Sequence, residues 1–412
     1  MTAEIVIANR QGIALAADSA VTVGKDRVWK TANKLFSLGP NNDIGVMIHG
    51  SADYLGVGWE TIVKMFKRHV GDNKYPTVKA TIEDFIEFVM SDRFRDERTE
   101  ELSISTFIVE KLEELKSALN YESKVEFRQQ IKAYSDEIVD YAGSAKKICD
   151  MSLKSFTQEW GDTIKSLAKD VLEETITNGV RDNIIRAFHA ICTHNVSSEY
   201  VTGVVFAGYG EEEIYPSLYA CNIDGRCNDL KRWWYIRESS SLNQGGYVIP
   251  FGQADIIFSF MEGITPESLE FIESALDATI RAKSMDLLNN YVKDPDEKIV
   301  EERIQRDANN EIVKSVLEEF QAYRTRTVAV PVIRNVNTLP KEELAAMAEA
   351  MIEITSLRRR VASKLESVGG PVDVAVISKG DGFVWVKRKQ YFDVEKNPEF
   401  LYREYRSTGG GQ

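Results

Sequence analysis

Position 2 of this chain holds a residue that could act as a nucleophile and a base together. Threonine has a small side chain, so we expect Met1 to be removed, which would leave Thr2 with a free α-amino group beside its hydroxyl. An α-amine has an ordinary pKa of about 7.7–8.0, so much of it can accept a proton near neutral pH. This is the chemistry of hydrolases that use an N-terminal threonine. Many proteins begin with Met-Thr, so Thr2 is informative only together with its neighbours.

Three further residues, at particular spacings from Thr2, make this position informative. Asp18 lies in GIALAADS, Lys34 in KTANKLF and Gly50 in GVMIHGSAD. With these motifs the chain resembles the proteasome β-type family of N-terminal nucleophile (Ntn) hydrolases, including the related bacterial proteasome-like protease. The spacing of Thr2, Asp18 and Lys34 matches that family without a gap, and Gly50 aligns after a small insertion around Asn41-Asn42.

The resemblance implies a role for each of these four residues. Thr2 would be the nucleophile, and a charged Lys34 close to its hydroxyl would favour the alkoxide-like state. Asp18 would keep Lys34 charged and oriented, and the backbone N–H of Gly50 would donate to the oxyanion. Taken singly, Asp18 fits the end of a buried strand, Lys34 an exposed strand lysine and Gly50 an ordinary turn, so the prediction depends on their joint register.

Other parts of the chain both extend and limit the resemblance. The run from Gly369 to Ile377, followed by Asp381-Gly382-Phe383, resembles the late strand pair of the family. Where the family has a supporting serine, this chain has Phe251. Where it has an acid and a second serine, this chain has Leu365 and Val368. Glu366 and Ser367, one residue away, could substitute after a local shift. The departures keep open an alternative in which the protein is a non-catalytic proteasome-like assembly or regulatory subunit.

Hydrophobic patterns predict strands near both ends and in the middle of the chain. The turn residues Asn9-Arg10-Gln11 predict a hairpin between the first two strands, and Gly380-Asp381-Gly382 predicts another between the last two. The apolar run Thr327–Ile333 also resembles a buried strand. The predicted strands are Glu4–Ala8, Gly12–Ala17, Lys34–Leu38, Ile44–His49, Tyr200–Gly208, Leu218–Asn222, Val372–Ile377 and Phe383–Val386.

Helices are predicted between these strands. One begins near Ala52, and another begins at Thr265-Pro266, a cap residue followed by proline. A block of helices reaches about Tyr323, and a further helix runs from Thr338 to Gly369-Gly370. The middle of the chain shows helical periodicity in the stripe Leu153, Phe156, Trp160, Ile164, Leu167 and Val171.

Together these patterns and the resemblance predict an α+β fold, a four-layer αββα Ntn-hydrolase sandwich with large helical insertions. We expect a discontinuous core at residues 1–95, 197–265 and 336–412, the last with a flexible tail. Helical insertions are expected at 96–196 and 266–335. The first insertion is predicted to serve access or partner binding, while the chemistry stays with the first fifty residues.

Composition excludes several classes of function. The 412 residues are 43% hydrophobic and 28% charged, and 51 Lys and Arg against 64 Asp and Glu give a net charge of −13. An acidic protein is a poor partner for nucleic acid or anionic lipid. No apolar run is long enough for a membrane helix and no signal peptide is evident, so we expect a cytoplasmic protein.

Cysteine usage points away from disulfides and metals. Cys149, Cys192, Cys221 and Cys227 have no CxxC spacing, which favours reduced thiols. Cys192 lies near His189 and His194 in the sequence, but this set is too small for a metal site. No cofactor or metal is expected.

The sequence therefore predicts a hydrolase of the threonine-peptidase type, active after removal of Met1. The resemblance implies amide-bond cleavage in peptides or unfolded polypeptides inside a homo-oligomeric ring, with an ATP-dependent unfoldase as a further partner. An amidase acting on a small molecule is a weaker alternative with the same chemistry.

Overall fold

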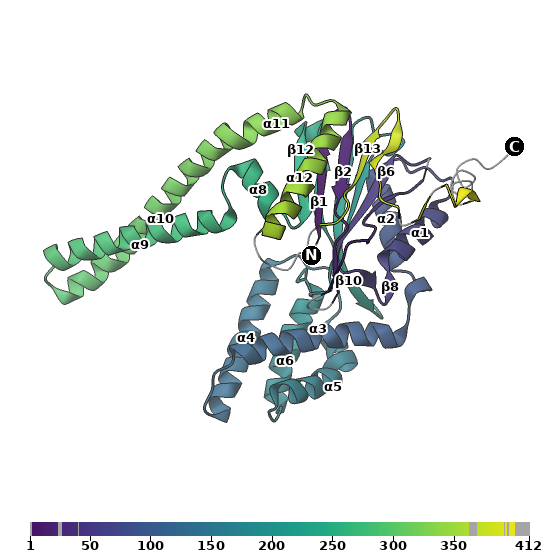
Figure 1. The fold of residues 1–412 in the computed structure, drawn as a ribbon. Helices are drawn as coiled ribbons and strands as arrows, with labels where there is room; N and C mark the ends of the chain where they lie inside the picture. The colour runs from purple at the N-terminus through teal and green to yellow at the C-terminus, as the bar shows by residue number, and fades with distance from the viewer. Residues whose placement is uncertain are drawn as a thin grey trace.

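Two antiparallel sheets form the centre of the computed structural model, which describes residues 2–23, 27–39, 41–361, 369–390, 392–393 and 395–399. Within these residues each sheet has five strands (Figure 1). The first runs in the order β12 (Tyr247–Gly252), β1 (Ala3–Ala8), β2 (Ile13–Ala17), β13 (Asp373–Ser378) and β14 (Gly382–Lys387). The second runs in the order β11 (Leu230–Ser240), β10 (Ser217–Cys227), β9 (Thr202–Gly208), β6 (Ile44–Gly50) and β5 (Leu35–Ser37).

The predicted hairpins and most predicted strands are confirmed. β1 pairs with β2 across the turn at Asn9, whose backbone N–H donates to the carbonyl of Gly12 at 3.0 Å. β13 pairs with β14 in the same antiparallel way. The α+β class is therefore confirmed, and the strand pairs of both sheets are antiparallel in the described part of the chain.

Side-chain alternation along β1 shows how the sheets are packed. Ala3, Ile5 and Ile7 face the helices on the outer side of the first sheet, whereas Val6 and Ala8 face the second sheet. Residues of both sheets meet in that inner cluster, including Leu15 on β2, Met47 on β6, Val205 on β9, Leu218 on β10 and Ile249 on β12. The inner faces of the sheets thus share one apolar core.

Helices cover the outer face of each sheet. On the second sheet, α1 (Trp59–Val70) and α2 (Val78–Val89) bury aromatic residues against Phe206 of β9. On the first sheet, α12 (Lys341–Val361) packs across β1, β2 and β13, joined by α8 (Asp255–Glu262). Short elements connect these layers: β3 (Val21–Val23), β4 (Arg27–Trp29), β7 (Asp53–Tyr54), β8 (Val57–Gly58), η1 (Asp92–Phe94) and α7 (Ser241–Gln244).

A group of four helices lies at one end of the sheets and has a core of its own (Figure 1). The predicted stripe is largely correct, because Phe156, Trp160 and Ile164 are buried there, but Leu153 is exposed. The buried face continues instead through Ala168 and Leu172. The helices are α3 (Glu97–Ala118), α4 (Lys124–Ser144), α5 (Leu153–Leu172) and α6 (Asn178–Thr193).

A second helical segment projects from the body as a long antiparallel arm (Figure 1). It consists of α9 (Pro266–Tyr291), with the predicted Thr265 cap, and α10 (Pro295–Arg324). The strand predicted at Thr327–Ile333 is wrong, since a π-helical turn, η2 (Thr325–Ala329), leads directly into α11 (Val330–Val336). A short apolar run does not distinguish strand from helix. Here the helical spacing places Val332, Ile333 and Val336 against the core under the first sheet.

Three other boundaries differ from the sequence predictions. The helix expected near Ala52 begins at Trp59, because the small β7–β8 hairpin comes first. Strands β11 and β12 were not predicted, since charged and exposed residues interrupt the alternation in β11. The helix expected to end at Gly369-Gly370 is described as far as Val361, and residues 362–368 and the tail lie outside the described residues. Within the described part of the chain, no helix is both long and apolar enough to cross a bilayer.

Candidate functional site

Asp18 and Lys34, which the sequence places 16 residues apart, are in direct contact. The Lys34 Nζ donates to Asp18 Oδ1 at 2.6 Å, and both side chains are almost completely buried. Lys34 Nζ also donates to the carbonyl oxygen of Ala20. Burial lowers the pKa of the Lys34 ammonium, and the adjacent carboxylate opposes that shift. The pair is thus a desolvated, oriented ion pair.

Asp18 also fixes the backbone around it. Its Oδ1 accepts from the N–H of Ala3 at 3.1 Å, and its Oδ2 accepts from the N–H of Gly369 at 2.9 Å and of Ala20 at 3.3 Å. One carboxylate therefore joins the start of β1, the segment after β2 and the segment before β13. Hydrogen bonds from three backbone N–H groups fix the orientation of this carboxylate.

Thr2 lies immediately before β1 and is 5% exposed. Its carbonyl oxygen accepts from the N–H of Gln253 at 2.7 Å, so the backbone pairing with β12 continues past the end of the strand. Gly252 has a φ of +70°, and a Cβ there would lie 2.1 Å from the Thr2 carbonyl oxygen. Glycine at 252 therefore allows the backbone of Thr2 to be this close to β12.

Gly50 is the last residue of β6 and lies opposite Thr202 of β9. It adopts a φ of +94°, and a Cβ would lie 2.3 Å from the carbonyl oxygen of Val201. Lys34 is tied to the same strand, because its carbonyl accepts from the N–H of Ile48 at 3.0 Å. Gly50 therefore ends β6, the strand that is hydrogen-bonded to the backbone of Lys34.

Sequence reasoning missed two titratable residues in this region, the fully buried Glu4 and the half-buried His49. Glu4 alternates with Val6 and Ala8 on the inner face of β1, and both its carboxylate oxygens lack a hydrogen-bond partner among the described residues. Burial raises its pKa to about 8, an effect that Lys34 opposes and Asp18 reinforces. The available signal was a charged residue inside an otherwise apolar strand.

His49 is the second residue that was missed. Its ring centroid lies 5.5 Å from that of Phe251, and it faces Gly203 of β9, where a Cβ would lie 2.0 Å from the imidazole. Burial, helped by the charge of Lys34, lowers its pKa to about 4, so the imidazole is neutral at neutral pH. Phe251, found where a supporting serine was sought, thus packs an aromatic ring beside the site. Leu365 and Val368 lie outside the described residues.

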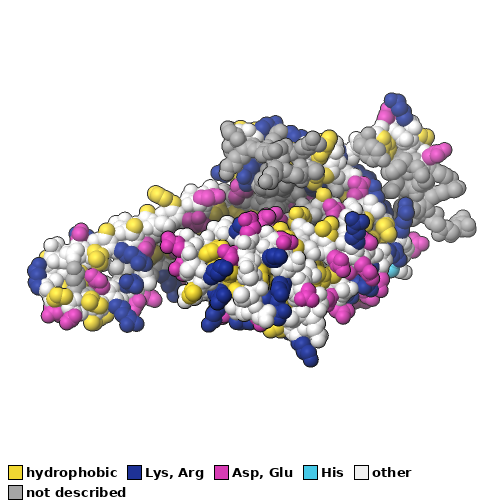
Figure 2. Space-filling view, turned by 90° about the horizontal axis from the view of Figure 1, so that it is seen from below, with side chains coloured by type: hydrophobic (Ala, Val, Ile, Leu, Met, Phe, Trp, Pro, Cys, Tyr) yellow, Lys and Arg dark blue, Asp and Glu magenta, His cyan; other side chains and the backbone are white. Residues whose placement is uncertain are grey.

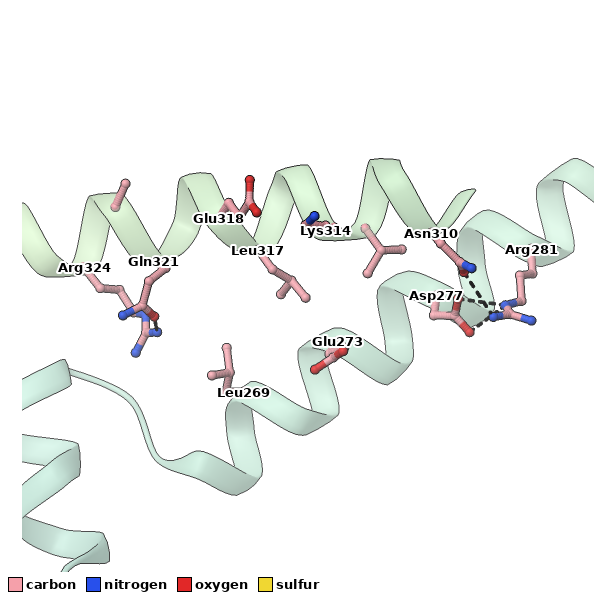
Figure 3. Close-up of a pocket in the computed structure, with 12 residues that line it drawn as sticks. Leu269, Glu273, Asp277, Arg281, Asn310, Lys314, Leu317, Glu318, Gln321 and Arg324 are labelled. Atoms are coloured by element: carbon pink, nitrogen blue, oxygen red, sulfur yellow. Dashed lines mark hydrogen bonds and ion pairs between the residues drawn. The ribbon is translucent and has the colours of Figure 1, made fainter. Parts of the chain in front are cut away.

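One groove lies away from these residues, in another part of the molecule. It has a volume of about 800 Å³ and lies between α9 and α10, where Arg281 contacts Asp277 and Asn310 (Figure 3). The residues that line it belong to the two arm helices, and Arg281 forms an ion pair there with Asp277 of the same helix. We therefore place the candidate chemistry at Thr2.

The structure provides no other obvious chemical centre among the residues that it describes. All four cysteines are free, and burial raises the pKa of Cys192 to about 11. His189 bonds to the carbonyl of Met151 and His194 to that of Ala190. Within the same described ranges, no group of three or more His, Cys, Asp or Glu side chains could hold a metal ion.

Comparison with known proteins corrects the family assignment. No family model matches the chain, and no curated protein is significantly similar to it. Similar solved structures include Anbu from Hyphomicrobium sp. strain MC1, as a Gly-1 mutant (TM-score 0.32, 9% identity) and in a second structure (0.31, 8%), and Anbu (ancestral beta-subunit) from Yersinia bercovieri (0.31, 10%). Each alignment covers 100% of this chain and 99% of the other.

The predicted membership of the proteasome β-type Ntn hydrolase family is therefore wrong as an assignment. The likeness that is found is to Anbu proteins, and its TM-scores and identities are too low to carry an argument about fold or function. Any proposal about the function of this protein must therefore depend on the residues and contacts of its own chain.

Replacing Gly252 by alanine tests how Thr2 is held. We expect Gly252→Ala to destabilise the fold more than Gly56→Ala, as measured by urea unfolding. Both glycines have positive φ, +70° and +78°, so alanine costs about 1–2 kcal/mol at either position. Of the two, the added Cβ at Gly252 clashes with a backbone oxygen, that of Thr2, whereas at Gly56 nothing lies within 4 Å of the added Cβ. Equal effects would contradict the close approach of β12 to Thr2.

Breaking the ion pair tests its energetic role. We expect Asp18→Asn to lower the free energy of unfolding by about 3–5 kcal/mol, because it leaves the buried charge of Lys34 without its counterion. The double variant Asp18→Asn with Lys34→Met should recover part of that loss, since the uncompensated charge is then gone. Strictly additive losses in chemical denaturation would show that the two side chains do not interact.

Proposed function

We propose that this protein is a hydrolase of the threonine-peptidase type, which cleaves amide bonds in peptides or unfolded polypeptides after Met1 is removed. The observation that carries the proposal is the fixed position of Thr2 at the start of β1, one residue from the N–H that binds Asp18, which in turn holds the Lys34 ammonium. This arrangement supplies a nucleophile, a base on the same residue and a buried cation.

The proposed reaction uses these groups in two stages. The Thr2 hydroxyl oxygen attacks the carbonyl carbon of the substrate and its proton passes to the α-amine of Thr2. The charge of Lys34 favours the developing alkoxide, and the N–H of Gly50 is proposed to donate to the oxyanion. The C–N bond then breaks, the leaving amine takes the proton, and the acyl group remains as an ester on Thr2. Water attacks the ester, which releases the acid and restores the hydroxyl.

The scaffold in this proposal is the four-layer αββα sandwich. Helices lie on both outer faces and two sheets share one core, so the ends of β1, β2 and β6 are fixed by packing on both sides. A rigid frame matters because a nucleophile gains rate only when its geometry is set before the substrate arrives. The helical segments 96–196 and 266–335 are proposed to control access or assembly.

A non-catalytic assembly subunit is the second candidate. It is favoured by Phe251, which puts an apolar ring where a supporting hydroxyl was sought, and by the small exposed fraction of Thr2. The buried ion pair speaks against it, because burying a lysine and an aspartate without a chemical use gives little stability.

The nucleophile is tested by covalent labelling. Intact mass first establishes that Met1 is absent, and the protein is then incubated with a threonine-directed epoxyketone or β-lactone. We expect one adduct, mapped by mass spectrometry to Thr2, and loss of peptide cleavage of about 10²-fold or more in Thr2→Ala and in Lys34→Met.

Thr2→Ser provides the matched control, because it keeps both the hydroxyl and the amine and should retain labelling. A free N-terminal Thr2 that stays unlabelled, or an adduct on another residue, would refute the proposed nucleophile.

We also propose that the protein is a homo-oligomer, with the α9–α10 arm as the contact and an unfoldase as a further partner. The arm exposes large apolar side chains, and both signs of charge lie on it (Figure 2). A surface that carries apolar and opposite charged groups together can be self-complementary about a two-fold axis. The exposed residues include Phe271, Tyr291, Ile299, Val300 and Ile304.

Light scattering at micromolar concentration tests this assembly. We expect a mass above the 46.5 kDa of one chain and a lower mass for Phe271→Ser with Ile304→Ser. Val125→Ser with Leu102→Ser, exposed on α4 and α3, is the control and should not change it. A wild-type protein that scatters as a monomer would refute the proposal.

A further inference from the structure

Glu4 is a buried acid in an otherwise apolar strand, and neither the strand nor the fold requires an acid at this position. The residue is fully buried, opposite Ala17 of β2 and Phe251 of β12, in a strand whose other members are apolar. Neither oxygen of its carboxyl group has a hydrogen-bond partner among the described residues. An unsatisfied carboxyl in an apolar core is costly, so its presence needs another reason.

The position of Glu4 relates it to the nucleophile. Side chains two apart on an extended segment point to the same face, about 7 Å from each other. Thr2 and Glu4 are related in this way, and Val6 and Ala8 continue the same face between the sheets. Glu4 therefore lies behind Thr2, on the side of the second sheet.

Charged groups meet around this carboxyl from several elements. Lys34, before β5, and Asp18, after β2, both interact electrostatically with Glu4. His49 of β6 is neutral and contacts the ring of Phe251, which lies opposite Glu4. Lys389, after β14, also acts on Lys34 and lowers its pKa, and Thr2 would carry an α-amine without Met1. A second acid thus accompanies the Asp18–Lys34 pair.

We propose that Glu4 is a positioning residue of the Thr2 site, whose carboxyl, enclosed between the two sheets near the Asp18–Lys34 pair, keeps Lys34 charged as the pH rises. This inference rests on the proposed function, since the charge of Lys34 is what activates Thr2. At neutral pH the carboxyl of Glu4 keeps its proton and Asp18 alone balances the ammonium. Above that pH Glu4 releases its proton, and the new carboxylate opposes loss of the Lys34 proton.

The physical basis is the opposition between burial and charge. Burial lowers the pKa of Lys34, so an isolated pair would lose its ammonium proton at a lower pH than an exposed lysine. A second negative charge near the pair favours the charged form and moves that loss to higher pH. Because the pKa of Glu4 is about 8, this second negative charge forms as the pH rises above neutrality.

The decisive experiment follows the titration of Lys34 directly. Lysine labelled with ¹³C at Cε is incorporated, and the Lys34 resonance is assigned by its absence from Lys34→Met. In Glu4→Gln we expect the midpoint of the Lys34 titration to fall by about one pH unit or more. The alkaline limb of the peptide-cleavage rate should shift by the same amount, with kcat affected more than KM.

Asp43→Asn is the matched control. Asp43 precedes β6, at the opposite end of that strand from Gly50, and burial raises its pKa as it does for Glu4. Its removal should leave the titration of Lys34 and the alkaline limb unchanged. Glu4→Met, which removes the carboxyl without adding a polar group, should reproduce the shift seen in Glu4→Gln.

Stability gives a second measurement that needs no catalysis. The folded-state pKa of Glu4 is raised above its usual value, so its contribution to stability is complete below about pH 4.5 and is lost as the pH rises to about 8. The free energy of unfolding of Glu4→Gln, measured with urea, should not show this decrease as the pH rises. The variant should therefore be more stable than wild type at pH 8.

The outcomes separate this inference from the proposed function. If the protein cleaves no peptide but Lys34 still titrates lower in Glu4→Gln, the hydrolase proposal fails and the role of Glu4 stands. If Lys34 titrates at the same pH in wild type, Glu4→Gln and Glu4→Met, the role of Glu4 is overturned.

Discussion

The buried ion pair of Asp18 and Lys34 is the interaction on which the N-terminal region depends. Its carboxylate accepts from the Lys34 ammonium and from the backbone of Ala3, Ala20 and Gly369. Ala3 begins β1 and Lys34 directly precedes β5. Ala20 follows β2, and Gly369 precedes β13. Removing the carboxylate would take an acceptor from each of them, so the geometry near Thr2 and the packing at that end of the first sheet depend on the same side chain.

The core between the sheets strengthens these electrostatic interactions. Val6, Leu15, Met47 and Val205 exclude water from the space beneath Thr2, and charges interact more strongly there than at the surface. The same exclusion makes Glu4 costly and lowers the pKa of both His49 and Lys34. One physical condition, dryness between two apolar sheets, therefore accounts for all three perturbed groups.

The two helical segments differ in how they bury apolar surface. Helices α3 to α6 enclose Phe156, Trp160 and Phe188 in a cluster that also includes Cys227 and Leu230 from the second sheet. Along α9 and α10, by contrast, Leu288 and Val313 are the apolar side chains that are buried among the described residues. A segment that packs on the body can transmit strain to it, whereas a projecting arm presents its surface to solvent or to a partner. This difference is why assembly is proposed for the arm.

The sequence by itself determined the main strands, the two hairpins and the capped start of α9, whereas the pairing of Asp18 with Lys34 was expected only from the resemblance. These features are local, because they depend on alternation, turn residues and spacing within short segments. Tertiary structure alone decided the rest. Glu4 became a buried acid without a hydrogen-bond partner among the described residues because its face of β1 meets the second sheet. Glycine is favoured at position 252 because β12, from far along the chain, comes close to the backbone of Thr2. Val332 and Ile333 joined a helix because α10 continues into them, although their types favour a strand. Which residues share a space, and how dry that space is, depends on contacts between distant segments, which no local pattern contains.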